Sequence, residues 1–220
     1  LNKVLKIQLM TLVALMALHE RKHIELFVWV NVLSIGFFGL KGGIFTIIGG
    51  GEGRVWGPPG GFFEDNNALA VALIMIIPMA YYLQLVFTRA WVRMGLLVLM
   101  LLTAVSALGT QSRGALLAIC AMGLVLWYRS KRKVLFGILM ILIGISLIAF
   151  MPTSWEQRMS TIATYEADRS AMDRIIAWQF CFNLANQRLL GGGFDIYEWA
   201  NYLVYAPPEA RFAFAAHSIY

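Results

Sequence analysis

The sequence predicts an all-α membrane protein, a polytopic bundle of about six transmembrane helices followed by a large outer loop that contains an interfacial helix. Three observations predict this class. Apolar residues make up 60% of the 220 residues, against about 45–50% in a typical soluble domain. Charged residues make up only 14%, and the mean hydropathy is +0.70. A soluble domain of this size could not hide so much apolar surface, and a disordered chain, a nucleic-acid-binding domain and a disulfide scaffold are excluded as well.

The apolar residues fall into runs at about 4–18, 24–40, 67–87, 94–109, 114–128 and 134–151. A helix that crosses about 30 Å of hydrocarbon needs about 20 residues. A spanning helix over one of the shorter runs must therefore include flanking residues that lie in the membrane interface. Backbone groups in a bilayer must bond to one another, so each run should be helical. We therefore expect a transmembrane region over 1–151 and an outer loop over 152–220. Because the chain starts at Leu1 and ends without a terminating signal, we expect a fragment of a longer chain.

The charges between the runs predict the orientation. Three short turns carry eight of the 18 basic residues, namely Arg21, Lys22, Arg89, Arg93, Arg129, Lys131, Arg132 and Lys133. The loops at 41–66 and 110–113 carry only Lys41, Arg54 and Arg113. The positive-inside rule places the first set in the cytoplasm. The two loops and the tail from 152 then face outward, toward the periplasm in a bacterium, and the formal net charge of +6 reflects this topology rather than a nucleic-acid partner.

The outer segments carry the unusual sequence. Residues 49–61 read GGGEGRVWGPPGG, which is too rich in glycine and proline for a helix or strand. Asp65 or Asn66 then provides a good N-cap for the third run. A later helix over about 170–189 starts with a capping-box-like sequence and is followed by three glycines. It is too polar to span, so we expect it on the membrane surface or over the mouth of the bundle. Its apolar stripe is Met172, Ile176, Phe180 and Leu184.

Arg113 stands in Ser-Arg-Gly at the outer end of a membrane hairpin. It is either an arginine that snorkels to the interface or a diphosphate ligand, since a guanidinium makes forked, charge-assisted hydrogen bonds. Arg169 and Arg174 open the later helix beside Asp168 and Asp173. They form either a solvated salt-bridge cluster or a second phosphate clamp.

His217 is either a surface residue or a base that works near neutral pH, because the ordinary pKa of histidine is about 6.5. Trp178 shares a helical face with Arg174. We find no histidine, cysteine and carboxylate cluster with metal-ligand spacing. A nucleotide-binding fingerprint is also missing, so we expect neither a metal nor a cofactor.

Four strings then point to a family. The longest is SIGFFGLKGGIFTIIGGGEGRVWGPPGGFFEDNNALA at 34–70, and the others are TQSRGALLA at 110–118, DRSAMDRIIAWQFCFNLANQRLLGGGF at 168–194 and AAHSIY at 215–220. Together they resemble the exosortase-associated O-glycosylation ligases, a branch of the O-antigen ligase and polymerase superfamily. In that superfamily the third string carries an arginine, a tryptophan four residues on and a glycine-rich stop.

The resemblance implies a GT-C-like glycosyltransferase of the bacterial inner membrane. It would move a glycan from undecaprenyl diphosphate to a glycan, lipid or protein acceptor on the periplasmic side, without a metal. The family's functional arginines carry over to Arg113 and Arg174, and its histidine carries over to His217. Arg54, Arg169 and Trp178 are the expected substrate-binding residues. The arginines would neutralise the departing diphosphate, and His217 would orient or deprotonate the acceptor hydroxyl.

Two other functions remain open. A polysaccharide polymerase of the same superfamily would use similar residues with a second lipid-linked glycan as its acceptor. A lipid-linked glycan transporter, which is no enzyme, would carry charged residues inside its spans. The runs 67–87 and 134–151 contain none, which counts against transport.

Overall fold

The computed structural model describes residues 2–130, 133–134, 137–138, 141, 145, 152–153, 169–188, 191–193 and 196–216. The chain divides into two compact units. One is Gln8–Met159, and the other combines Leu1–Ile7 with Ser160–Tyr220. The first holds most of the apolar runs, and we refer to it as the bundle unit. The second, the C-terminal unit, holds the later helix, and each unit is described by itself.

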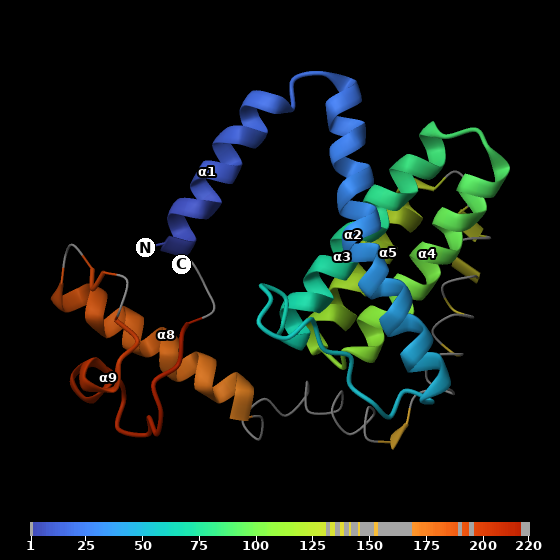
Figure 1. Ribbon diagram of the computed structural model, residues 1–220. Coiled ribbons are helices and arrows are strands. Elements are labelled where there is room, and N and C mark those ends of the chain that lie inside the picture. The colour runs from blue at the N-terminus through green and yellow to red at the C-terminus, as the bar shows by residue number, and fades with distance from the viewer. Residues whose placement is uncertain are drawn as a thin grey trace. The chain divides into compact units, whose positions relative to one another are not determined.

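Every regular element among the described residues is a helix, as predicted (Figure 1). The helices are α1 (Asn2–Ala17), α2 (Arg21–Ile48), α3 (Asn66–Val86), α4 (Ala90–Gly109), α5 (Arg113–Arg129), α8 (Arg169–Gln187) and α9 (Trp199–Tyr205). Within the described ranges, three helices are long and apolar enough to cross a membrane, namely α2, α3 and α4. The predicted run at 134–151 lies mostly outside the described residues.

Helices α2 to α5 run up and down beside one another (Figure 1). Helix α3 is central, since it packs against α2, α4 and α5. Its N-terminal half contributes Leu69 and Leu73 to one apolar cluster, together with Ala107 of α4 and Ala115 of α5. Its C-terminal half joins a second cluster made by Val32, Ile76, Ala80, Leu83, Leu96 and Leu99. The bundle therefore has a continuous apolar core around α3, with polar connections at its two ends.

The predicted end of the second apolar run is wrong. We expected the helix to end at 40 and an outer loop to begin at Lys41, but α2 continues to Ile48 and Lys41 is helical. The apolar run is interrupted at Lys41-Gly42-Gly43, and glycine weakens an isolated helix. In the structure both glycines are buried inside α2, so tertiary packing overrides the local preference.

The packing that extends α2 is its close contact with α4. A Cβ atom on Gly39 would overlap the side chain of Thr103, and one on Gly43 would overlap the carbonyl oxygen of Leu102. Gly42 lies equally close to Ser106 of α4, and Gly36 lies somewhat farther from Leu99. Small residues at such spacing let two membrane helices approach backbone to backbone. The glycines at 36–43 therefore line the close contact between α2 and α4, which we call the α2–α4 seam.

The C-terminal unit is built on α8, which starts within one residue of its predicted position. Phe180 and Leu184 of the predicted stripe are buried. They pack against Tyr202 and Tyr205 of α9, and the rings of Phe180 and Tyr202 stack at 4.2 Å between centroids. The stripe therefore faces a second, short helix of the same unit, which the sequence did not predict.

Candidate functional site

The Thr-Gln-Ser-Arg turn joins α4 to α5 and is buried at its centre. Thr110 is fully buried, and its backbone carbonyl accepts a hydrogen bond from Asn66 Nδ2 at 2.9 Å. Gln111 has a φ of +54°, in the left-handed region. A residue other than glycine seldom adopts this conformation, and the strain costs about 1–3 kcal/mol. Its amide donates to the carbonyl oxygen of Gly51 at 3.3 Å, so contacts from two other segments hold the turn.

Ser112 connects the N-termini of α3 and α5. Its Oγ caps α5 by accepting a hydrogen bond from the backbone N–H of Ala115 at 3.3 Å. The same hydroxyl lies 2.7 Å from Asn67 Oδ1, to which it donates. Asp65 caps α3 as predicted, since its Oδ1 accepts from the N–H of Asn67 at 2.9 Å. Two helix N-termini, each with a partial positive charge, therefore meet at this end of the bundle.

Arg113 is the first residue of α5 and is half-buried at this junction. Its guanidinium adds a full positive charge to the partial charge at the N-terminus of α5, while the carboxylate of Asp65 already caps the N-terminus of α3. Helix N-termini and arginine side chains are both groups that bind phosphate oxygens. The arrangement can therefore stabilise an anion at the outer end of the α4–α5 hairpin.

The glycine-rich loop between α2 and α3 reaches the same junction and contains neither helix nor strand, as predicted. The N–H of Val55 donates to the carbonyl oxygen of Gly109 at 2.9 Å, and the Val55 side chain is buried in the bundle core. Arg54 precedes this anchor and is half-buried. Its guanidinium lies 5.5 Å from the centroid of the Trp56 ring. The structure thus brings Arg54 and Arg113 to one end of the bundle unit.

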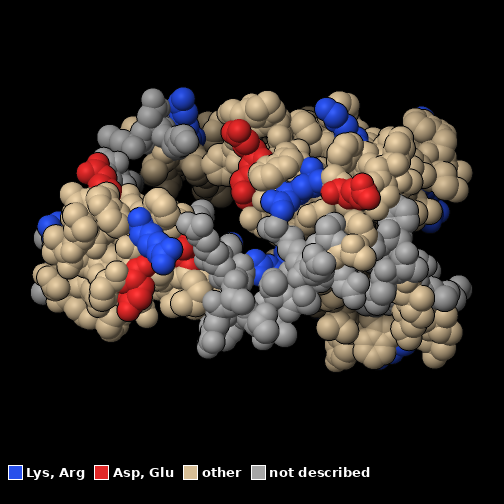
Figure 2. Space-filling model, turned by 90° about the horizontal axis from the view of Figure 1, so that it is seen from below, with Lys and Arg blue, Asp and Glu red and all other residues tan. Residues whose placement is uncertain are grey.

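This end is not purely basic. The view from below shows Lys and Arg side chains next to Asp and Glu side chains (Figure 2). Glu52 and Glu64 lie exposed on the glycine-rich loop. Glu64 is engaged within the loop, because its Oε2 accepts from the N–H of Gly60 at 3.0 Å. The acidic groups make the surface mixed in charge, so an anion would depend on specific contacts rather than on a broad positive field.

The other predicted residues belong to the C-terminal unit. Arg169 and Arg174 lie in the first turns of α8, and Arg174 is exposed. Trp178 follows Arg174 by one helical turn and is 50% exposed. Its indole N–H donates to the carbonyl oxygen of Ala216 at 2.9 Å. His217 itself lies outside the described residues, but this bond holds the residue before it to α8.

A further contact in this unit was not predicted from the sequence. The hydroxyl of Tyr202 donates a short hydrogen bond to the carbonyl oxygen of Phe214. Burial raises the pKa of the Tyr202 hydroxyl above its ordinary value. Burial and the contact with the Cys181 thiol likewise raise the pKa of Tyr197. Both phenols therefore stay protonated at neutral pH, and Tyr202 remains a donor. No short-range sequence signal links Tyr202 to Phe214, since the two are joined by an irregular segment.

Residues 97–220 match the family described as O-Antigen ligase. This chain belongs to the O-antigen ligase family. The match begins in α4 and includes the Thr-Gln-Ser-Arg turn, α8 and α9. Residues 1–88 match a family of unknown function, DUF5935. No curated protein and no solved structure matches the chain.

Family membership confirms the broad prediction made from the four strings. The protein is a multi-pass membrane enzyme of the ligase type, and its family implies a lipid-linked glycan as donor. The three candidate catalytic residues, Arg113, Arg174 and His217, lie inside the matched region, as do Arg169 and Trp178. Within the described ranges, no group of three or more histidine, cysteine and carboxylate residues is placed to hold a metal ion.

Proposed function

We propose that this ligase transfers a glycan from undecaprenyl diphosphate to an acceptor hydroxyl on the periplasmic face of the bacterial inner membrane. The observation that carries the proposal is the family match over the segment that contains Arg113, Arg174 and His217. The string at 34–70 supports assignment to the exosortase-associated branch. The basic residues of the short turns, at the ends of the helices away from Arg113, support the orientation. We further propose a GT-C-like arrangement of about six spans over 1–151, with 152–220 as the periplasmic loop.

In the proposed reaction the acceptor oxygen attacks the anomeric carbon of the glycan. The bond between that carbon and the diphosphate oxygen breaks, and undecaprenyl diphosphate departs with the electron pair. Arg113 and Arg174 neutralise the charge that develops on this leaving group, which lowers the barrier when the cations are preorganised. Arginine suits this task because it stays charged at every relevant pH. Arg54 and Arg169 contribute weaker contacts to the same anion, and no metal takes part.

His217 accepts the proton of the acceptor hydroxyl in this scheme. Trp178 supports it in two ways. Its indole N–H holds the carbonyl oxygen of Ala216, which restricts the chain directly before the histidine. Trp178 is half-exposed and offers an apolar surface to substrate. Trp178 thus acts as a positioning residue for the segment that precedes the base.

His217→Ala in the full-length protein is expected to lose glycan transfer yet to bind the lipid-linked donor normally, because the arginines hold the diphosphate. The wild-type pH–rate profile should rise near the histidine pKa, at about pH 6–7. Transfer in proteoliposomes and donor binding in a separate equilibrium assay measure the two effects. Loss of donor binding together with transfer would move His217 to the diphosphate site. Normal transfer by the variant would refute the assignment of the base.

A further inference from the structure

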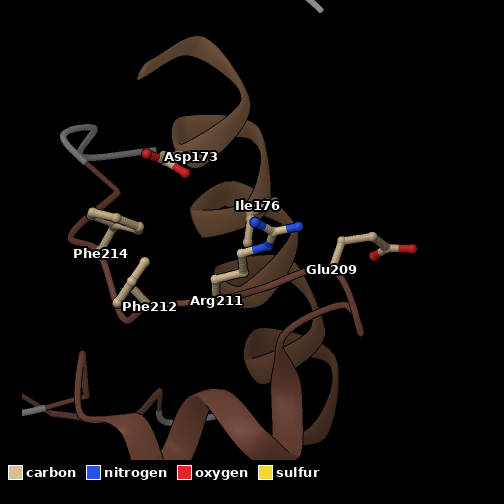
Figure 3. A pocket seen from close by; sticks show the side chains of 6 residues that line it. All are labelled: Asp173, Ile176, Glu209, Arg211, Phe212 and Phe214. Atoms are coloured by element: carbon tan, nitrogen blue, oxygen red, sulfur yellow. The ribbon is translucent and has the colours of Figure 1, made fainter. Parts of the chain in front are cut away.

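A pocket of about 220 Å³ lies in the C-terminal unit, between α8 and the segment that follows α9. Its lining residues are Asp173, Ile176, Glu209, Arg211, Phe212 and Phe214. Figure 3 shows the two phenylalanine rings on one side of the space and Arg211 beside Ile176 on the other, with Asp173 at one end. Of the predicted residues that the structure describes, Arg54, Arg174 and Trp178 do not line this pocket, although Arg174 is the chain neighbour of Asp173.

The wall that carries the two phenylalanines is held in place. Tyr202 donates to the carbonyl oxygen of Phe214, and Trp178 donates to the carbonyl oxygen of Ala216. The segment is therefore hydrogen-bonded to α9 at Phe214 and, two residues later, to α8 at Ala216. Phe212 and Phe214 contact each other edge to face, with centroids 6.2 Å apart. The pocket is therefore largely preformed, as small-molecule sites usually are.

The polar groups of the pocket remain available. Among the described residues, Asp173 and Arg211 make no side-chain hydrogen bond or ion pair with each other or with a third group. Asp173 is half-buried, while Arg211 is exposed. Phe212 is 54% exposed. The pocket thus combines an accepting carboxylate, a donating guanidinium and a partly exposed aromatic side chain.

This combination selects against several ligands. Among the described lining residues, two carboxylates accompany one guanidinium, which disfavours a diphosphate. A lipid chain would desolvate charged side chains without pairing them, which is costly. The volume lies below the ~300–1,000 Å³ of pockets for drug-sized ligands. A small neutral molecule with many hydroxyl groups and an apolar face fits all three conditions.

We propose that this pocket binds one neutral sugar ring, with the C–H face of the ring against Phe212 and its hydroxyls bonded to Asp173 and Arg211. Hydroxyl groups both donate and accept, so they can satisfy the carboxylate and the guanidinium together. The assignment deepens the proposed glycan transfer and rests on it for the biological source of the sugar. That source is either the glycan of the lipid-linked donor or the glycan of the acceptor.

Saturation-transfer-difference NMR of the full-length protein in lipid nanodiscs, with free glucose and free N-acetylglucosamine as probes, tests the pocket directly. Saturable binding of at least one sugar is expected. Phe212→Ala should weaken it about 3- to 10-fold, by loss of the aromatic contact, and Asp173→Asn should weaken it as well. Phe182→Ala is the matched control, because Phe182 is an exposed aromatic of α8 that does not line the pocket. Absence of saturable binding, or equal binding by the Phe212 and Phe182 variants, would overturn the proposal.

Transfer assays separate the two sources of the sugar. A higher KM for the donor in Phe212→Ala supports a donor sugar, and a higher KM for the acceptor supports an acceptor sugar. Unchanged KM values for both substrates would contradict a role in transfer. Because NMR binding needs no turnover, a wild-type protein that binds sugar but transfers no glycan would refute the proposed function and leave the pocket assignment standing.

Discussion

Arg113→Ala is expected to lose nearly all glycan transfer, while Arg113→Lys should keep only part of it. The guanidinium stands at the junction of two helix N-termini, where a departing diphosphate would gain charge. Loss of a contact that tightens in the transition state costs about 2–4 kcal/mol, or roughly 30- to 1,000-fold in rate. Lysine keeps the charge but cannot make the planar, forked contact. Initial rates of transfer in proteoliposomes, at matched protein level, measure the difference.

Arg129→Ala is the control for this experiment. Arg129 is the last residue of the same helix, and the basic turn that it opens is predicted to face the other side of the membrane. Its loss should leave the rate close to that of the wild type. If Arg113→Ala and Arg129→Ala retain equal, full activity, Arg113 is an interfacial arginine and the diphosphate is bound elsewhere.

Gly43→Ala is expected to destabilise the bundle by about 1–3 kcal/mol, the usual cost of overpacking. The added methyl group would overlap the carbonyl oxygen of Leu102. Because this is a backbone atom, only a movement of α2 relative to α4 can relieve the overlap. Thermal unfolding of the full-length protein in nanodiscs, followed by circular dichroism, should show a lower midpoint.

Gly95→Ala is the matched change on the partner helix. A Cβ atom at Gly95 meets nothing within 4 Å, and alanine forms helix better than glycine by about 1 kcal/mol. This variant should unfold at the wild-type temperature or above it. If the Gly43 and Gly95 variants unfold alike, the α2–α4 seam does not depend on glycine contacts.

The sequence predicted those elements that depend on local signals. The N-cap Asp65 of α3 could be predicted, because a carboxylate directly before a long apolar run is a local signal for the start of a helix. Helix α8 and its buried stripe followed from apolar spacing. The predicted end of α2 was too early, because the apolar run stops at Lys41. The contacts of Gly42 and Gly43 that continue the helix depend on the presence of α4 and Val55.

The site could be predicted only as a set of residue types. Arg113 and Arg174 were candidates by their positions, and the family strings gave them a role. No residue pattern showed that Ser112 and Asn67 join two helix N-termini. The left-handed conformation of Gln111 carries no signal, because glycine is the residue that usually marks it. Hydrogen bonds between distant segments, such as that from Trp178 to Ala216, depend on the folded chain alone.

The release of undecaprenyl diphosphate tests the central claim most directly. Full-length protein in proteoliposomes would receive a lipid-linked glycan and an acceptor, and both products would be quantified by mass spectrometry. Glycan transfer predicts one free undecaprenyl diphosphate for each glycan that reaches the acceptor, and neither product from the His217→Ala variant. Movement of intact lipid-linked glycan across the membrane, with no free undecaprenyl diphosphate and no modified acceptor, would contradict the account.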